Sequence, residues 1–257
     1  MIKKSLFMAI VLAGLAWQAS GVQAAATDLV EAIRPETVTI DAAFNGTQVS
    51  VTGNVAADAD VMIRVVGKTE EYKLKQKGRA LGVLWMNMGS VHIAKVPNLF
   101  LLYGPDGAGS AQTEFPPQLG MESIRQGAEI VAQDPDKKGL LEEFFKLKQK
   151  AGLYGTMNKA IQYGAANGAT KPFTASLKLP SALPQGAFDI DVFAIRNGAV
   201  MTQTVRHIEV KEVGLPAWIS ELAFQHGAIY GTLSVLIAIF AGWFTGILFK
   251  SSKGGAH

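Results

Sequence analysis

Met86, Met88 and His92 are the residues whose types and spacing come nearest to a metal-binding pattern. Thioether and imidazole groups suit Cu(I), and residues at alternate positions of a β-strand point to one face of the sheet. Ordinary packing explains the same residues more simply, because Trp85, Met86 and Met88 in an apolar strand are usually packing residues. We therefore expect no resident metal or cofactor and keep copper binding as the alternative.

The other residues with chemical potential do not combine into a recognisable catalytic site. Asp189 and Asp191 alternate with apolar residues, which is typical of a strand with one wet face. The sequence contains no GxSxG, HExxH, Walker-type or GxGxxG motif, and it contains no cysteine. No histidine lies at ligand spacing from another; the four are His92, His207, His226 and His257. We expect that the protein is not an enzyme.

The sequence is rich in hydrophobic residues, and the excess of these residues lies at the two ends of the chain. Hydrophobic residues make up 49% of the sequence and charged residues 18%. Four of the 24 basic residues lie in the terminal segments, which carry none of the 21 acidic residues, so the middle of the chain is close to neutral. A nearly neutral middle excludes the basic patch that nucleic-acid binding requires.

The N-terminus has the three-part layout of a signal peptide. Two lysines precede an uncharged apolar run over residues 6–17, and small residues follow at Val22, Ala24 and Ala26. Signal peptidase requires small side chains one and three residues before the cut, so the sequence predicts a signal peptide over residues 1–24. Cleavage after Ala26 is the second choice. An uncleaved anchor is the alternative, although the run is shorter than the ~20 residues that span a bilayer.

Residues 229–249 form an uncharged apolar run that predicts a transmembrane helix. The alternative, a buried helix of a soluble protein, would require a groove that is apolar on every side. Lys250 and Lys253 follow the run, and positive charge beside a span is retained in the cytoplasm. We therefore expect a bacterial inner-membrane protein with one span, a periplasmic domain over residues 25–214 and a cytoplasmic tail over residues 250–257.

A row of small residues lies along one face of the predicted transmembrane helix. Ser234, Ala238, Gly242 and Gly246 recur every four residues. Small side chains allow a second helix to approach closely, so this face predicts packing against another copy or against a polytopic membrane protein. Chance is the alternative, because glycine and alanine are common in transmembrane helices.

The region between the ends alternates apolar and polar residues in short stretches rich in Val, Ile, Thr and Phe, which indicates strands. Asn45-Gly46 and Asn197-Gly198 are typical of tight hairpin turns. Short strands at this density predict a mainly β fold, an immunoglobulin-like β-sandwich. The expected strands are residues 38–44, 47–55, 60–67, 70–76, 80–88, 90–96, 99–103, 173–179, 187–196 and 200–210.

Helical patterns interrupt the expected strands at about residues 118–152. Residues 118–133 are a helix candidate, and residues 137–150 place Leu140, Leu141, Phe144, Phe145 and Leu147 on one side of a second helix. A short juxtamembrane helix is expected over residues 215–228, beginning at Pro216. Its apolar residues fit either the bilayer surface or packing on the domain; they are Trp218, Leu222 and Phe224.

The sequence resembles the transmembrane protein family Alph_Pro_TM, first noted in alphaproteobacteria, over nearly the whole mature chain. The resemblance rests on VLWMN and VPNLF near residues 83–100, AGLYG at 151–155, LPQGAFDIDVFAIRNG at 183–198 and AGWFTGILF at 241–249. It implies an exported protein with a single span. Genes of the family often neighbour sulfite-exporter-type permeases, which implies an accessory role, and the family carries no agreed catalytic residues.

These observations predict a membrane-anchored periplasmic accessory or interaction protein. Its expected partners are the lipid bilayer and, through the transmembrane helix, a polytopic membrane protein such as a sulfite-exporter-type permease, or a second copy. A periplasmic module that binds a small anion or a metal such as copper is the alternative from another functional class.

Overall fold

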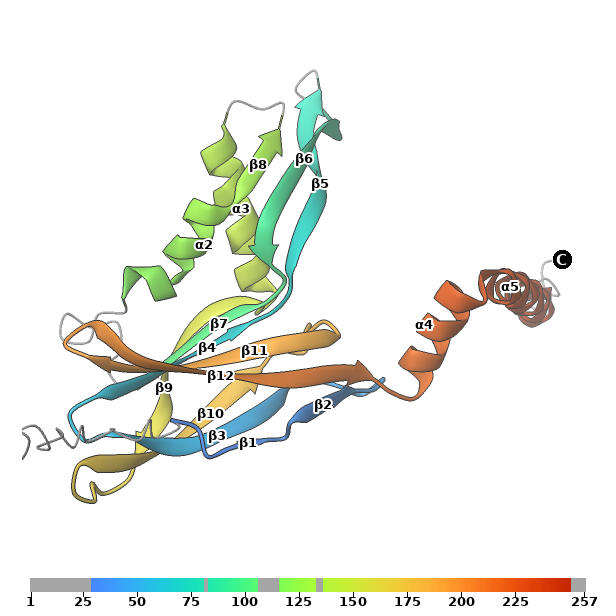
Figure 1. Cartoon of the computed structure of the whole chain (residues 1–257). Coiled ribbons are helices and arrows are strands. Elements are labelled where there is room, and N and C mark those ends of the chain that lie inside the picture. The colour runs from blue at the N-terminus through green and yellow to red at the C-terminus, as the bar shows by residue number, and fades with distance from the viewer. Residues whose placement is uncertain (1–28, 81–82, 106–115, 133–135, 251–257) are drawn as a thin grey trace, which may run out of the picture.

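The chain is organised around two β-sheets, one of nine strands and one of three (Figure 1). The structure, a computed structural model, describes residues 29–80, 83–105, 116–132 and 136–250. The predicted signal peptide and residues 251–257 of the predicted tail lie outside the described residues. Two helices that follow the last strand carry the chain away from the sheets.

The large sheet is antiparallel except at two places. From one edge to the other its strands are β1 (Ala32–Arg34), β3 (Thr47–Ala56), β10 (Thr170–Leu179), β9 (Tyr154–Tyr163), β7 (Phe100–Pro105), β4 (Asp60–Val66), β11 (Gly186–Arg196), β12 (Ala199–Glu212) and β2 (Thr37–Ile40). The two parallel pairs are β7 with β9 and β12 with β2.

This sheet folds over itself, so that β4, β7, β11 and β12 lie above β1, β3 and β10 (Figure 1). The main core fills the space between these layers. Val49 and Val51 of β3 are buried in the same cluster as Val61 and Ile63 of β4. Side chains alternate along a strand, so each layer directs every second residue into this core. The structure confirms a mainly β, sandwich-like fold.

The small sheet and two helices form a separate projection, which we call the appendage. It contains β5 (Thr69–Ala80), β6 (Leu84–Pro97) and β8 (Glu129–Ala132), together with α2 (Met121–Gly127) and α3 (Lys137–Lys150). The β5–β6 hairpin leaves the large sheet between β4 and β7, and β8 and α3 lie between β7 and β9 in the chain. Phe144 and Phe145 of α3 pack with Val91 and Ile93 of β6 in a second core cluster.

The helix predicted over residues 137–150 and the last strands of the large sheet are confirmed. Asp136 begins α3, and its side chain accepts a hydrogen bond from the Gly139 N–H at 2.9 Å. Asn197 and Gly198 both have positive φ angles, of 52° and 76°, and connect β11 to β12. These angles are those that a two-residue hairpin turn requires, which explains why Asn-Gly predicts it.

The hairpin predicted at Asn45-Gly46 is wrong. The strands on its two sides do not pair, because β2 lies beside β12 whereas β3 lies between β1 and β10. Gly46 has a φ of 88°, and a Cβ atom there would come within 2.7 Å of the Leu179 carbonyl oxygen. Glycine is therefore needed for a close passage of the chain rather than for a hairpin.

The strands predicted over residues 80–88 and 90–96 have different boundaries in the structure. The first prediction begins at the last residue of β5, and its later part and the whole second prediction belong to β6, which continues through residue 89. The register shifts there, because Gln76 pairs with Gly89 and Lys77 pairs with Asn87, which leaves Met88 as an extra residue. Such a β-bulge bends a strand without ending it. The long hairpin joins the small sheet instead of the expected sandwich.

Two further differences concern the segments on either side of α3. The helix predicted over residues 118–133 is a 3-10 turn followed by α2, which ends at Gly127. Its last part is β8, where Ile130 and Val131 favour a strand because their branched side chains fit a pleated surface. Residues 154–163 were not expected to form a strand, yet they form β9, whose pattern of buried residues lacks regular alternation.

Candidate functional site: an apolar helix beside the β domain

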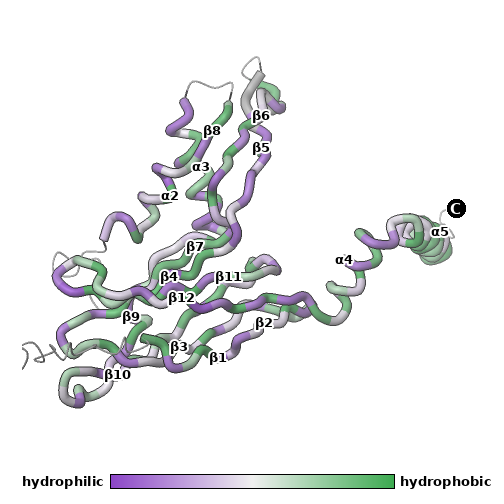
Figure 2. The backbone as a smooth tube through the Cα atoms, viewed as in Figure 1, coloured by the Kyte–Doolittle hydropathy of each residue, from purple (hydrophilic) through white to green (hydrophobic). Residues whose placement is uncertain are grey.

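The C-terminal helix α5 (Gly227–Lys250) has the length and composition of a membrane span. Within residues 227–249, the most apolar window of 18 residues has a mean hydropathy of 2.1, and none of this window is buried against the described part of the chain. At 1.5 Å per residue, a helix of this length reaches across the ~30 Å hydrocarbon layer of a bilayer. Figure 2 shows the apolar character along the helix.

The serine and threonine hydroxyls of α5 are satisfied within the helix itself. The hydroxyls of Thr232, Ser234 and Thr245 donate to the carbonyl oxygens four residues earlier, at 2.8 to 2.9 Å. In hydrocarbon, a hydroxyl without a partner would be costly, and donation to the helix backbone removes that cost. These three hydroxyls therefore need no partner outside the helix.

The small residues predicted for helix packing leave an open face on α5. Ser234, Ala238, Gly242 and Gly246 all lie within the helix. A Cβ atom added at Gly242 or Gly246 would meet nothing within 4 Å in the described residues. The face is accordingly free to receive another helix, and its role in packing remains a prediction.

The juxtamembrane helix α4 (Leu215–Gln225) connects the β domain to α5. It is tied to the end of β12 by a hydrogen bond of 2.9 Å from Ser220 Oγ to Glu212 Oε2. Phe224 is 89% exposed and Trp218 is 52% exposed, so the described residues leave most of the first side chain and about half of the second uncovered. Their exposure favours the bilayer surface, because aromatic side chains gather at membrane interfaces.

The three residues with metal-binding character lie along β6. Met86 is exposed, and the side chain of Met88 lies outside what the structure describes. His92 Nδ1 lies 3.2 Å from Glu71 Oε1 on the adjacent strand. The bulge at Met88 separates Met86 from His92, so the regular alternation that would place all three on one face is interrupted. Among the described residues, no group of three His, Cys, Asp or Glu side chains could hold a metal.

The two aspartates of β11 have different environments, although the sequence places both on a wet face. Asp189 is exposed and pairs with His207 at 2.7 Å. Asp191 is only 6% exposed and accepts hydrogen bonds from Arg64 of β4 at 2.8 and 2.9 Å, and from Gln203 of β12 at 3.2 Å. The expectation of a wet face is wrong for Asp191, because neighbouring strands supply its partners.

A partly buried polar cluster surrounds Lys148 and was not found from the sequence. Lys148 Nζ donates to Tyr72 Oη at 2.7 Å and to the Asn98 carbonyl oxygen at 3.3 Å. Tyr72 Oη in turn donates to Glu70 Oε2 at 2.9 Å. Burial lowers the pKa of Lys148, and the charge of Glu70 opposes this effect. The cluster joins α3 to β5 at the base of the appendage.

Helical spacing could have identified Lys148. It follows Phe144 and Phe145 by four and three residues, the spacing that places side chains on one face. The apolar pattern instead predicts that Leu147 lies on the packed side, and this prediction is wrong because Leu147 is 59% exposed. Lys148 takes the core position because its ammonium group lies 4.0 Å from the centre of the Tyr72 ring.

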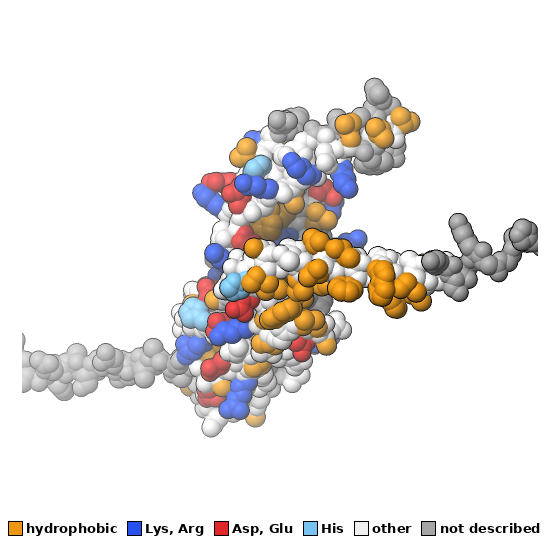
Figure 3. Space-filling view, turned by 90° about the vertical axis from the view of Figure 1, so that its right-hand side faces the viewer, with side chains coloured by type: hydrophobic (Ala, Val, Ile, Leu, Met, Phe, Trp, Pro, Cys, Tyr) orange, Lys and Arg blue, Asp and Glu red, His pale blue; other side chains and the backbone are white. Residues whose placement is uncertain are grey.

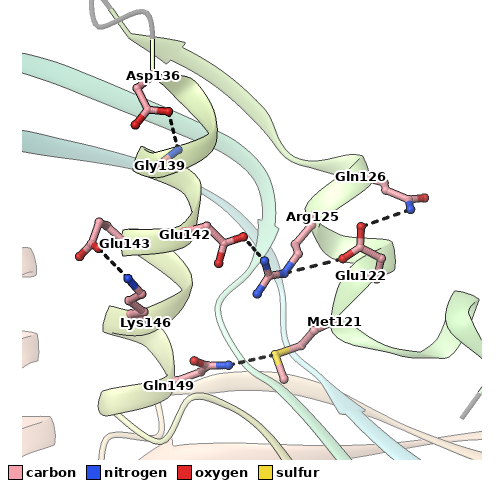
Figure 4. A network of polar contacts seen from close by, with 10 residues as sticks. All are labelled: Met121, Glu122, Arg125, Gln126, Asp136, Gly139, Glu142, Glu143, Lys146 and Gln149. Carbon is pink, nitrogen blue, oxygen red and sulfur yellow. Dashed lines mark hydrogen bonds and ion pairs between the residues drawn. The ribbon is translucent and has the colours of Figure 1, made fainter. Parts of the chain in front are cut away.

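A second polar network holds α2 against α3 (Figure 4). Arg125 of α2 pairs with Glu142 of α3 and with Glu122 one turn earlier in α2. Its guanidinium group also lies 4.6 Å from the centre of the Phe145 ring. This arrangement explains why the short helix α2 is held in place without a large apolar face of its own.

Residues 28–251 match a family model described as putative transmembrane protein (Alph_Pro_TM). No curated protein matches the chain. The matched residues include the β domain, the appendage, α4 and α5.

Proposed function

Because the chain belongs to the Alph_Pro_TM family of transmembrane proteins, we propose that it is a membrane-anchored accessory protein of the bacterial envelope. In this proposal α5 spans the inner membrane, and the β domain and appendage lie in the periplasm. The accessory role consists of binding an integral membrane partner rather than catalysing a reaction.

The observation that carries the proposal is the complete exposure of α5. An apolar helix that the described part of the chain leaves exposed, and whose serine and threonine hydroxyls are satisfied, is stable in lipid. Each Leu, Ile, Phe or Val near the centre of a span favours insertion by about 0.3 to 0.6 kcal/mol. Ile237, Ile239 and Phe240 are among the exposed residues that supply this energy.

The charges at the two ends of the sequence support the proposed orientation. Lys250 and Lys253 follow the span, and Lys3 and Lys4 precede the apolar run of the expected signal peptide. Positive residues beside a span stay in the cytoplasm, and a signal peptide exports the chain that follows it. Both features therefore favour a periplasmic domain with a cytoplasmic C-terminus.

The open face of α5 favours a helical partner within the membrane. Glycines at positions 242 and 246 allow the backbones of two helices to approach closely. The partner proposed is a polytopic membrane protein, of which a sulfite-exporter-type permease is an example; a second copy of this chain is the other candidate. The polar clusters of the described residues support a non-catalytic role, since those around Lys148 and Arg125 connect structural elements.

Cysteine crosslinking in native membranes tests this proposal, because the sequence has no competing thiol. The full chain would carry Gly242→Cys or Gly246→Cys on the small-residue face. Phe240→Cys and Ile247→Cys, on the opposite face of a helix with 3.6 residues per turn, serve as controls. Membranes would be treated with a crosslinker, extracted in mild detergent and examined for covalent adducts.

We expect adducts with a polytopic protein from positions 242 and 246 and few from positions 240 and 247. Adducts between two copies alone would assign the face to self-association. Recovery of only the monomer from all four positions would contradict the proposal of a partner.

A further inference from the structure

The free end of the β5–β6 hairpin carries apolar side chains that the described part of the chain leaves uncovered. Val83, Leu84 and Met86 are 84%, 64% and 47% exposed. A single exposed apolar residue is common in proteins, but a group at the end of a projecting hairpin indicates an interaction surface. We call these three residues the hairpin tip.

The part of β5 nearest the hairpin tip is basic. Residues 72–91 contain four basic residues and no acidic one. Lys73, Lys75 and Lys77 are exposed and alternate along β5, so they lie on one face of the strand. In a bilayer, anionic headgroups lie outside the hydrocarbon. A protein segment with apolar residues at its end and basic residues behind them matches this arrangement.

The hairpin also extends toward the side of the molecule where the membrane must lie. Figure 1 places the β5–β6 hairpin at the end of the appendage. Figure 3, turned by 90°, shows hydrophobic side chains at the end of this upper lobe and along α5, both extending to the same side. The bilayer that α5 spans therefore lies on the side toward which the hairpin points.

We propose that the hairpin tip is a second membrane contact, inserting Val83, Leu84 and Met86 into the outer surface of the bilayer that α5 spans. Lys73, Lys75 and Lys77 then lie near anionic headgroups. This inference rests on the proposed function, because α5 must first hold the domain at the membrane. Tethering raises the local concentration of lipid around the tip, so a small apolar surface suffices for contact.

A lipid surface fits the tip better than a protein does. The three apolar residues lie at the end of a hairpin, not in a groove that would receive a side chain or helix. The basic face of β5 complements anionic lipid headgroups, which are the charges nearest to any chain anchored by α5. Two contacts would fix the orientation of the β domain and appendage above the membrane.

Fluorescence quenching in vesicles tests the inference on the full chain. Leu84→Cys would be labelled with an environment-sensitive fluorophore, and the protein reconstituted into vesicles of phosphatidylethanolamine and phosphatidylglycerol. Lipids with nitroxide groups near the headgroup report contact with the bilayer surface, and iodide reports contact with water. Val83→Cys is a second reporter if the first variant fails to fold. Met201→Cys, at the end of β12 away from α4, is the water-exposed control, and Ile239→Cys in α5 reports anchoring.

We expect nitroxide lipids to reduce the emission at position 84 and iodide to leave it unchanged, with the reverse at position 201. The inference would be overturned if iodide, but not nitroxide lipid, quenches position 84. Quenching of position 239 by nitroxide lipid in the same vesicles would show that the anchor is intact. Protection of position 84 from both quenchers would show a protein at the tip and also overturn it. Absence of lipid quenching at position 239 would instead contradict the proposed function. Equal lipid quenching at position 84 in vesicles without anionic lipid would overturn the role of the three lysines.

Discussion

Lys148 of α3 and Tyr72 of β5 form a hydrogen bond of 2.7 Å between Nζ and Oη, although 76 positions separate them in the sequence. Phe144 and Tyr154 also lie near the ammonium group, with their ring centres 5.7 Å away. The contact closes the base of the appendage, where the β5–β6 hairpin leaves the large sheet. The orientation of the appendage thus depends on a buried cation.

Replacing Lys148 with alanine should destabilise the protein. The change removes the donor to Tyr72 Oη and leaves space between aromatic rings, so we expect the free energy of unfolding to fall by about 2 kcal/mol. Chemical denaturation of the full chain in mild detergent, followed by circular dichroism, measures this. Lys146→Ala is the control, because Lys146 is exposed and pairs only at the surface with Glu143; equal stability of the two variants would contradict the account.

Stability should decrease at alkaline pH because buried tyrosines resist ionisation. Burial raises the pKa of Tyr103 and of Tyr163 above the ordinary value of 10.0. Above pH 10 the unfolded state loses these protons and the folded state keeps them, so stability falls as the pH rises further. Denaturation at about pH 9 and about pH 11, with phenolate absorbance as a second readout, measures this effect. An equal fall in stability with pH after Tyr103→Phe and Tyr163→Phe would contradict it.

Lys148 should make the stability of the protein rise with pH, below the pH range in which the tyrosines make it fall. Burial lowers its pKa, so between the folded value and the ordinary value of 10.5 the unfolded state binds more protons. The contribution of Lys148 to stability therefore rises with pH through that window. Lys148→Met should flatten the rise, as measured by denaturation at a series of pH values, and an unchanged slope would show that the lysine is ionised equally in both states.

Replacement with asparagine should reduce the free energy of unfolding much more at Asp191 than at Asp189. Asp191→Asn leaves Arg64 without its carboxylate in a partly buried site, and we expect a loss of about 3 kcal/mol in the free energy of unfolding. Asp189→Asn alters only an exposed pair with His207, so its effect should stay within about 0.5 kcal/mol. Similar melting temperatures for both variants would count against the described pairing.

Replacing Gly53 with alanine tests the close packing of β3, and the same change at Gly127 is the control. A Cβ atom at Gly53 would lie 1.8 Å from the Leu29 carbonyl oxygen, so Gly53→Ala must displace the backbone. We expect a loss of about 2 kcal/mol or more, since overpacking is strongly destabilising. Gly127→Ala meets nothing within 4 Å and lies in α2, so it should be neutral or stabilise by about 0.5 kcal/mol. Thermal denaturation of both variants decides this, and a neutral Gly53→Ala would refute the close approach.

The elements predicted correctly from the sequence carry strong local signals. The limits of α3 follow from Asp136 and the helical spacing of apolar residues, and the β11–β12 hairpin follows from Asn197-Gly198. The helix α5 follows from an uninterrupted apolar run. Each depends on residues within a few positions of one another, so no knowledge of distant contacts was needed.

The errors concern contacts between distant parts of the chain. Asn45-Gly46 favours a hairpin locally, but the pairing of β2 with β12 overrides that preference. The β5–β6 hairpin lies between β4 and β7 in the chain. It leaves the large sheet because β4 and β7 pair directly with each other. Lys148 and Asp191 are buried because their partners come from other elements, and charged residues alone predict exposure.

The central claim is that α5 spans the inner membrane with the β domain on the periplasmic side. Labelling with a membrane-impermeant maleimide tests it most directly, in cells whose outer membrane alone is permeable. Met201→Cys on exposed β12 and Ser252→Cys beyond α5 are the two sites, each in the full cysteine-free chain. The account predicts labelling at position 201 and none at position 252 until the inner membrane is disrupted. Labelling of both positions in intact inner membranes, or release of the protein into the soluble fraction by osmotic shock, would contradict it.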